Sequence, residues 1–180
     1  MDYKSDYNGS SHNTLSAFEN DTNLVLNGTL TSEFTEFDPH DLWHDRLHKV
    51  LSPDKINRPV DEGCAYLYGG SWGLSWKEIL EKFKAYAAAN KDADWLTLYN
   101  ESRNFDEKAN HPLRADFVIN GLLVKKIERE KGFSAVMELL SCGRKEADDA
   151  NYFRALERIT GISKSSFNSN IVKLIKEDSP

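Results

Sequence analysis

The chain has 180 residues, of which 39% are hydrophobic and 29% are charged, and its net charge is -6. This length and composition are typical of one globular domain with a hydrophobic core. The acidic balance argues against a nucleic-acid-binding protein. No apolar run approaches the ~20 residues that span a bilayer, so we expect no membrane span.

The first residues of the chain, 1–22, are polar and show no hydrophobic periodicity, which predicts an irregular segment. They contain no apolar h-region, so no signal peptide is visible. The next stretch, Asn23–Asn27, is a candidate strand ended by Asn27-Gly28, and a surface hairpin is an equal alternative. We therefore expect a small β element ahead of the helices.

Two short helices are predicted next. The first runs over residues 39–51, because Asp38 is a suitable N-cap and Pro39 suits the first helical position. Pro53 marks where this helix must have ended. A second helix is predicted to start at Pro59.

These two helices carry a candidate metal site. His44 and His48 are four residues apart, so they share one helical face and can converge on one ion. If the helices pack antiparallel, Glu62 lies at about the height of His48. Helix axes about 8–10 Å apart leave a gap that zinc can bridge between an imidazole and a carboxylate. Two histidines and one carboxylate would leave a fourth position open, as in catalytic zinc sites.

The stretch resembles the gluzincin metallopeptidases, which carry His-Glu-x-x-His on one helix and a glutamate on the next. The segment Glu62-Gly63-Cys64-Ala65 is similar to the Glu-Gly-x-Ala segment of that family. The resemblance implies that His44, His48 and Glu62 bind one zinc ion. It also implies a zincin-like domain that hydrolyses peptide bonds, with an N-terminal strand element before the zinc helix.

The chain departs from this family at the catalytic position, where Asp45 replaces the family's glutamate. That residue takes a proton from the metal-bound water and passes it to the leaving amine. A general base must come within about 2.6–3.2 Å of its partner, and aspartate is one methylene shorter than glutamate. Asp45 is the candidate catalytic residue, and an active and an inactive peptidase remain equal alternatives.

The second half of the chain is predicted to be helical. Helical patterns cover residues 75–90, 112–131, 133–142, 148–160 and 163–176. Ser75-Trp76-Lys77-Glu78 reads as a capping box, and Gly132 and Gly161 end two of the helices. Cys64 and Cys142 are expected to stay unpaired, with Cys64 a small buried side chain.

Other candidates are left open. Three histidines spread over eight residues of one straight helix cannot bind a single ion, because they span about 12 Å. His40 is therefore interpreted as a residue at the rim of the metal site or at the surface. Asp41 and Tyr66 are candidate partners of the ligands. Tyr99 and His111 are candidates for stabilising an oxyanion, although the motif does not extend to them.

The sequence thus predicts a mainly α (α+β) protein. Its single metallopeptidase-like domain would cover residues 23–180, with the zinc-site part at 23–73 and a helical bundle at 74–180. The cofactor would be one zinc ion, and a peptide or protein would be the substrate. Relatives of this kind are often exported, which favours a periplasmic or secreted location. The alternatives are an inactive relative that serves as a binding module and a metal-free helical interaction domain.

Overall fold

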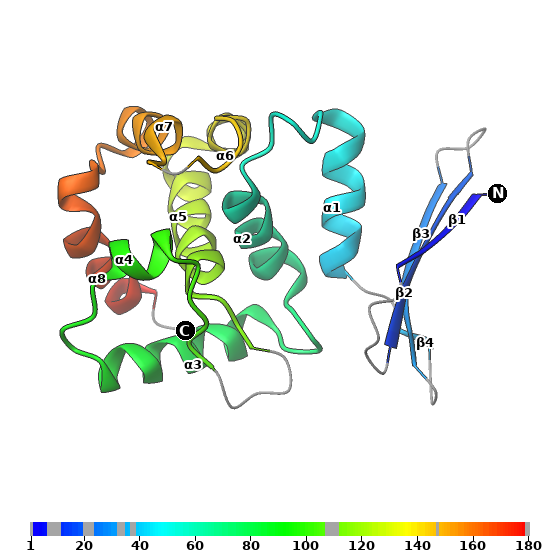
Figure 1. Ribbon diagram of the computed structural model, residues 1–180, viewed down its shortest axis with the longest axis horizontal. Helices are drawn as coiled ribbons and strands as arrows, with labels where there is room; N and C mark the ends of the chain where they lie inside the picture. The colour runs from blue at the N-terminus through cyan, green and yellow to red at the C-terminus, as the bar shows by residue number, and fades with distance from the viewer. Residues whose placement is uncertain are drawn as a thin grey trace.

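The fold is taken from a computed structural model (Figure 1). It describes the backbone of residues 2–6, 12–19, 24–31, 35–36, 39–106, 112–146 and 148–178. Side chains are described from residue 39 onward within these ranges. This part of the chain is mostly helical, which confirms the mainly α prediction.

The N-terminal backbone runs as four antiparallel strands in the order β1-β2-β3-β4. Their bounds are Asp2–Asp6, His12–Glu19, Leu24–Thr31 and Thr35–Glu36. The segment predicted to be irregular, 1–22, therefore contains β1 and β2, and the strand predicted over Asn23–Asn27 falls largely within β3.

Eight α-helices and one short 3-10 helix follow within the described residues. The helices are α1 Pro39–Val50, α2 Arg58–Gly69, α3 Trp76–Ala89, α4 Trp95–Asn100, α5 Ala115–Lys131, α6 Phe133–Leu140, α7 Ala150–Thr160 and α8 Phe167–Glu177, with η1 at Lys164–Ser166. These bounds lie within a few residues of the predicted ones, apart from α4, which the sequence analysis treated only as a short apolar segment.

Local signals in the sequence account for several helix ends. The Ser75 side chain accepts a hydrogen bond from the Glu78 backbone N–H, and the Glu78 carboxylate accepts one from the Ser75 backbone N–H. This is the predicted capping box. Gly132 and Gly161 end α5 and α7 with φ of 82° and 77°, a region that glycine enters without steric cost.

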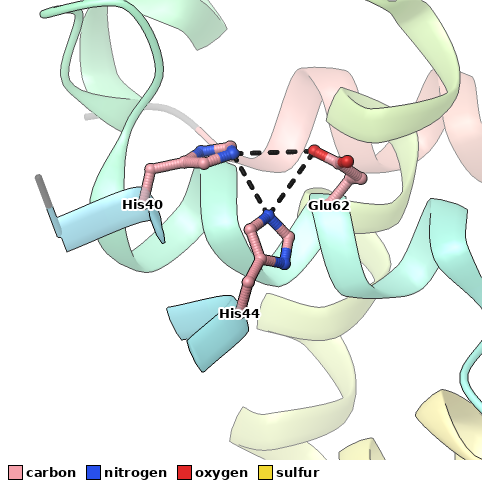
Figure 2. A group of neighbouring side chains, drawn as sticks. All are labelled: His40, His44 and Glu62. Carbon is pink, nitrogen blue, oxygen red and sulfur yellow. Dashed lines mark hydrogen bonds and ion pairs between the residues drawn. The ribbon is translucent and has the colours of Figure 1, made fainter. Parts of the chain in front are cut away.

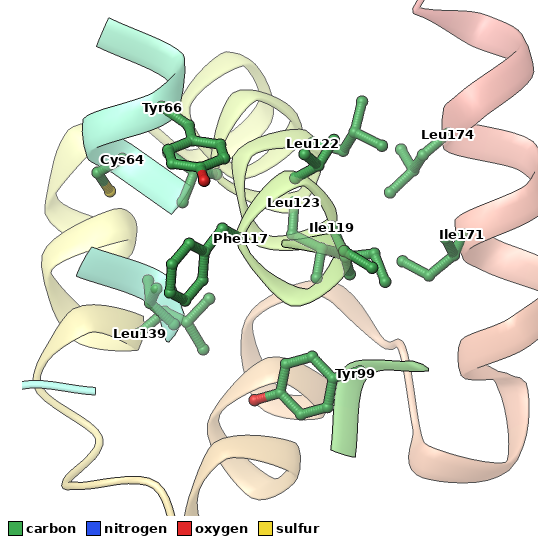
Figure 3. Close-up of a cluster of buried hydrophobic side chains, with 14 of the residues drawn as sticks. Cys64, Tyr66, Tyr99, Phe117, Ile119, Leu122, Leu123, Leu139, Ile171 and Leu174 are labelled. Atoms are coloured by element: carbon green, nitrogen blue, oxygen red, sulfur yellow. The ribbon is translucent and has the colours of Figure 1, made fainter. Parts of the chain in front are cut away.

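The hydrophobic core is built around α5, which packs against α2, α3, α4, α6 and α8 (Figure 1). Every residue from Ala115 to Val124 is buried. Figure 3 shows the side chains of Ile119, Leu122 and Leu123 packed among residues from the surrounding helices. A helix that is apolar on all sides in this way needs neighbours on all sides.

Close packing of α2 on α5 depends on glycine. A Cβ atom at Gly63 would lie 2.6 Å from the Asn120 Cβ and 2.8 Å from the Gly121 nitrogen. No larger residue fits this crossing without moving the backbone. Gly63 therefore fixes the position of α2, and with it the side chains of the preceding residues, Asp61 and Glu62.

Two further observations concern the cysteines and the lengths of the helices. Cys64 and Cys142 are both free, and Cys64 is buried. Among the described helices, none is both long enough and apolar enough to cross a lipid bilayer.

Candidate metal site between the first two helices

Helices α1 and α2 pack antiparallel, with the start of α1 beside the end of α2 (Figure 1). Glycine again sets the distance, because a Cβ at Gly69 would lie 2.4 Å from the His40 backbone nitrogen. The two backbones are therefore nearly in contact at the level of His40. This contact determines which α1 side chains face Glu62.

Three side chains converge at that level: His40 and His44 from α1, and Glu62 from α2. We call them the triad, and Figure 2 shows their rings and carboxylate pointing toward one another. The two histidine Nε2 atoms are 3.3 Å apart, and they lie 3.6 Å and 3.8 Å from Glu62 Oε2. Tetrahedral zinc with bonds of about 2.0–2.2 Å separates its ligand atoms by about 3.3–3.5 Å. The triad thus comes within a few tenths of an ångström of that spacing.

Hydrogen bonds fix the orientation of both rings. His40 Nδ1 donates to the Gly70 carbonyl oxygen at 2.7 Å. His44 Nδ1 donates to the carboxylate of Asp61, at 3.0 Å from each oxygen. A neutral histidine carries one proton, so both Nε2 atoms present a lone pair to the centre of the triad.

Lone pairs that face one another attract a cation or a proton. Burial of His40 disfavours its charged form, but its hydrogen bonds with Glu62 and Gly70 outweigh burial, so the pKa of His40 is raised above its ordinary value. Burial also disfavours ionised Glu62, yet the hydrogen bond from His40 and the nearby charge of His44 lower the pKa of Glu62. Positive charge at the centre of the triad is therefore favourable.

A second group of possible ligands shares His44 and contains His48 and Asp61. Its geometry fits an ion less well, because the His44 to Asp61 separation of 3.0 Å is that of a hydrogen bond. The His48 side chain is 46% exposed, and its Nε2 lies 3.7 Å from Asp61 Oδ2. The structure therefore brings His40, and not His48, next to His44 and Glu62.

The triad is accessible from solvent without being open on all sides. The side chains of His40, His44 and Glu62 are 17%, 20% and 15% exposed. Glu62 Oε1, the oxygen that points away from the triad, lies 3.5 Å from the largely exposed Arg58. All three side chains of the triad are thus mostly buried, with a minor part of each at the surface.

The remaining candidates lie in several places. Asp45 follows His44 on α1 and is partly buried, and Asp41 follows His40 in the same way. Tyr66 is buried with its ring centroid 5.8 Å from that of His40. Tyr99 is buried in the core, stacked on Tyr152, and His111 lies outside the described residues.

Sequence reasoning gave no role to Asp61, the carboxylate that holds His44. A signal was present, because Asp61 directly precedes Glu62 and therefore lies at the same level of α2. Adjacent carboxylates on a helix point about 100° apart, so one can reach the centre of a site while the other reaches behind a ligand.

Comparisons with protein-family models, with curated proteins and with solved structures find no match for this chain. The chemistry of the site itself therefore has to indicate the function.

Proposed function

We propose that this chain holds one zinc ion between His40, His44 and Glu62 and acts as a metal-dependent hydrolase. The convergence of two Nε2 lone pairs and one carboxylate oxygen at 3.3–3.8 Å from one another supports the proposal. Imidazole and carboxylate ligands in a set of three are typical of catalytic zinc. The same donors suit other divalent transition metals, and zinc is the choice that agrees with a four-coordinate geometry.

Three protein ligands leave a fourth position for a substrate or a water molecule. A bound zinc ion would polarise a peptide carbonyl and activate a coordinated water for attack on it. Peptide-bond hydrolysis is the proposed reaction, in keeping with the resemblance of the Glu62-Gly63-Cys64-Ala65 segment to gluzincins.

The general base in this proposal is Asp41 and no longer Asp45. The sequence His-Asp-x-x-His occurs twice in α1, starting at His40 and again at His44. With His40 as the first ligand, Asp41 has the position that Asp45 has in the later register. Asp41 also lies close enough for its charge to act on His40. Its carboxylate would accept the proton of the attacking water and return it to the leaving amine.

A metal-binding module without turnover is the second candidate. One observation favours it: the carboxylate beside the first histidine belongs to an aspartate, which is one methylene shorter than glutamate. The proton would then have to be transferred over a longer distance than a general base tolerates. Metal binding does not depend on Asp41, so the triad would keep its ion.

Hydrolysis of a mixed peptide library by the zinc-loaded chain, with and without chelator, separates the two candidates. If the chain is a peptidase, cleavage stops with chelator and falls at least about 100-fold in Asp41→Asn, the low end of general-base effects. Asp45→Asn is the matched control and should keep its activity. Zinc binding without cleavage would support the metal-binding module and contradict the peptidase. Absence of zinc binding would contradict both candidate functions.

A further inference from the structure

We propose that Asp61 is a positioning residue of the metal site: a buried carboxylate that fixes His44 in the tautomer and orientation needed to bind the ion. The inference rests on the proposed metal triad and adds a residue that does not itself contact the ion. It also gives Asp61, a member of the second group of possible ligands, the role of supporting the triad.

The Asp61 side chain is 6% exposed and is held from two sides. Its Oδ1 accepts a hydrogen bond from the indole N–H of Trp43 at 2.8 Å. Both carboxylate oxygens lie 3.0 Å from His44 Nδ1. Trp43 can only donate, so Asp61 is kept as an acceptor, and an acceptor at this place requires the proton of His44 on Nδ1.

This arrangement makes Asp61 unsuitable as a ligand. An ion between His44 Nδ1 and Asp61 would have to replace the hydrogen bond and push the two atoms apart from 3.0 Å. His48, the third member of that group, is also the most exposed of the site's histidines. Carboxylates that hold the far nitrogen of a ligating histidine are a recurring part of zinc sites.

The two ligating histidines are supported differently. His40 donates to the neutral carbonyl of Gly70, whereas His44 donates to a carboxylate. Together with Glu62, Asp61 brings two negative charges to the site, which match the charge of a divalent ion. We therefore expect Asp61 to strengthen binding of a dication through both charge and orientation.

Replacing Asp61 by asparagine separates the effects of charge and orientation from the effect of packing. In Asp61→Asn the shape is kept, but an amide N–H₂ can now face His44 Nδ1 and donate to it. The proton of His44 then moves to Nε2, the atom that should bind the ion. We expect the affinity for zinc to fall about 10–100-fold, the usual range for such supporting residues. Trp43→Phe keeps the carboxylate and should cost less than Asp61→Asn.

The experiment measures zinc affinity by competition with a chromophoric chelator and the tautomer of His44 by ¹⁵N NMR of the metal-free chain. The wild-type His44 should carry its proton on Nδ1, and Asp61→Asn should move it to Nε2. Asp149→Asn, which removes a buried carboxylate on a distant part of the fold, is the matched control and should change neither quantity.

The outcomes separate this inference from the proposed function. A wild-type chain that binds no zinc would overturn the metal site itself. A wild-type chain that binds zinc, together with an Asp61→Asn variant of equal affinity and unchanged tautomer, would overturn only the role of Asp61. If Asp61→Asn does not fold, a wild-type His44 protonated on Nε2 in the metal-free chain still contradicts the inference.

Discussion

Polar groups that lie against the two faces of α2 are arranged in opposite ways. On the side of α5, the buried Asn120 amide meets complementary partners: it donates to the Asp116 backbone carbonyl at 2.8 Å and accepts from the Tyr152 hydroxyl at 2.9 Å. On the side of α1, His40, His44 and Glu62 direct acceptors toward one point. Complementary pairs stabilise a fold by themselves, whereas converging acceptors are stabilised by a proton or a metal ion placed between them.

The substitution with the largest expected effect tests the α1 face. Glu62→Gln replaces the carboxylate of a proposed ligand by an amide, and zinc affinity should fall more than about 100-fold, since residues outside the ligand set already contribute about 10–100-fold. Without metal, the variant should lose less than about 1 kcal/mol of stability at pH 8, because its amide can donate to a histidine nitrogen in place of the lost carboxylate interactions. Competition with a chelator and chemical denaturation measure the two quantities.

Asn120→Ala is the counterpart on the α5 face. It leaves the Tyr152 hydroxyl buried without its acceptor, so the free energy of unfolding should fall by about 1–3 kcal/mol, with zinc affinity unchanged. If Glu62→Gln destabilised the metal-free chain as much as Asn120→Ala does, the difference between the two faces would not hold.

The crossing of α2 and α5 gives the next prediction. Gly63→Ala places a Cβ 2.6–2.8 Å from Asn120 and the α5 backbone, so the free energy of unfolding should fall by about 1–3 kcal/mol. In Gly121→Ala the new Cβ meets the Trp76 side-chain ring at 2.6–2.7 Å and the Gly63 carbonyl oxygen only at 3.2 Å. This substitution should cost less, because a side chain can move more easily than the backbone that Gly63→Ala meets. If denaturant titrations showed that both variants lose the same free energy of unfolding, the contact between Gly63 and the α5 backbone would not explain the loss.

The smallest effect is expected at Asp149, a buried carboxylate far from the triad. Burial raises the pKa of Asp149 above its ordinary value, although Lys145 and Lys164 oppose the shift. A raised pKa in the folded state means that stability is lost as the pH rises through it. Asp149→Asn should therefore raise the free energy of unfolding at pH 7 by less than about 1 kcal/mol.

The pH dependence provides the check for Asp149→Asn. The advantage of the variant should shrink as the pH falls through about 4, because below the ordinary pKa of aspartate the wild-type carboxyl is protonated in both states. Asparagine also accepts the left-handed backbone of this residue, where φ is 52°. An advantage that is constant with pH would show that the effect is not one of charge.

Much of the helical fold could be predicted from the sequence because its signals are local. The capping box at Ser75 and the glycines at 132 and 161 mark helix ends whatever surrounds them. The sequence also predicted that the first two helices pair, with histidines on one and Glu62 on the other. This prediction was possible because Pro53 and Pro59 limit the length of the connection between the two helices.

Which two histidines lie beside Glu62 could not be predicted in this way. His-Asp-x-x-His occurs in two overlapping registers, and the choice depends on the height at which α2 passes α1. Gly69 and Gly63 set that height through contacts with His40 and with α5, which are distant in sequence. Asp61 then accepts the hydrogen bond of His44 Nδ1 and leaves Nε2 directed toward His40.

Zinc affinities of His40→Gln and His48→Gln, measured side by side with the wild type, test the central claim most directly. Both variants remove one histidine from the same helix. The triad predicts a loss of more than about 100-fold in His40→Gln and little change in His48→Gln. A wild-type affinity in His40→Gln, with the loss appearing in His48→Gln, would contradict the account.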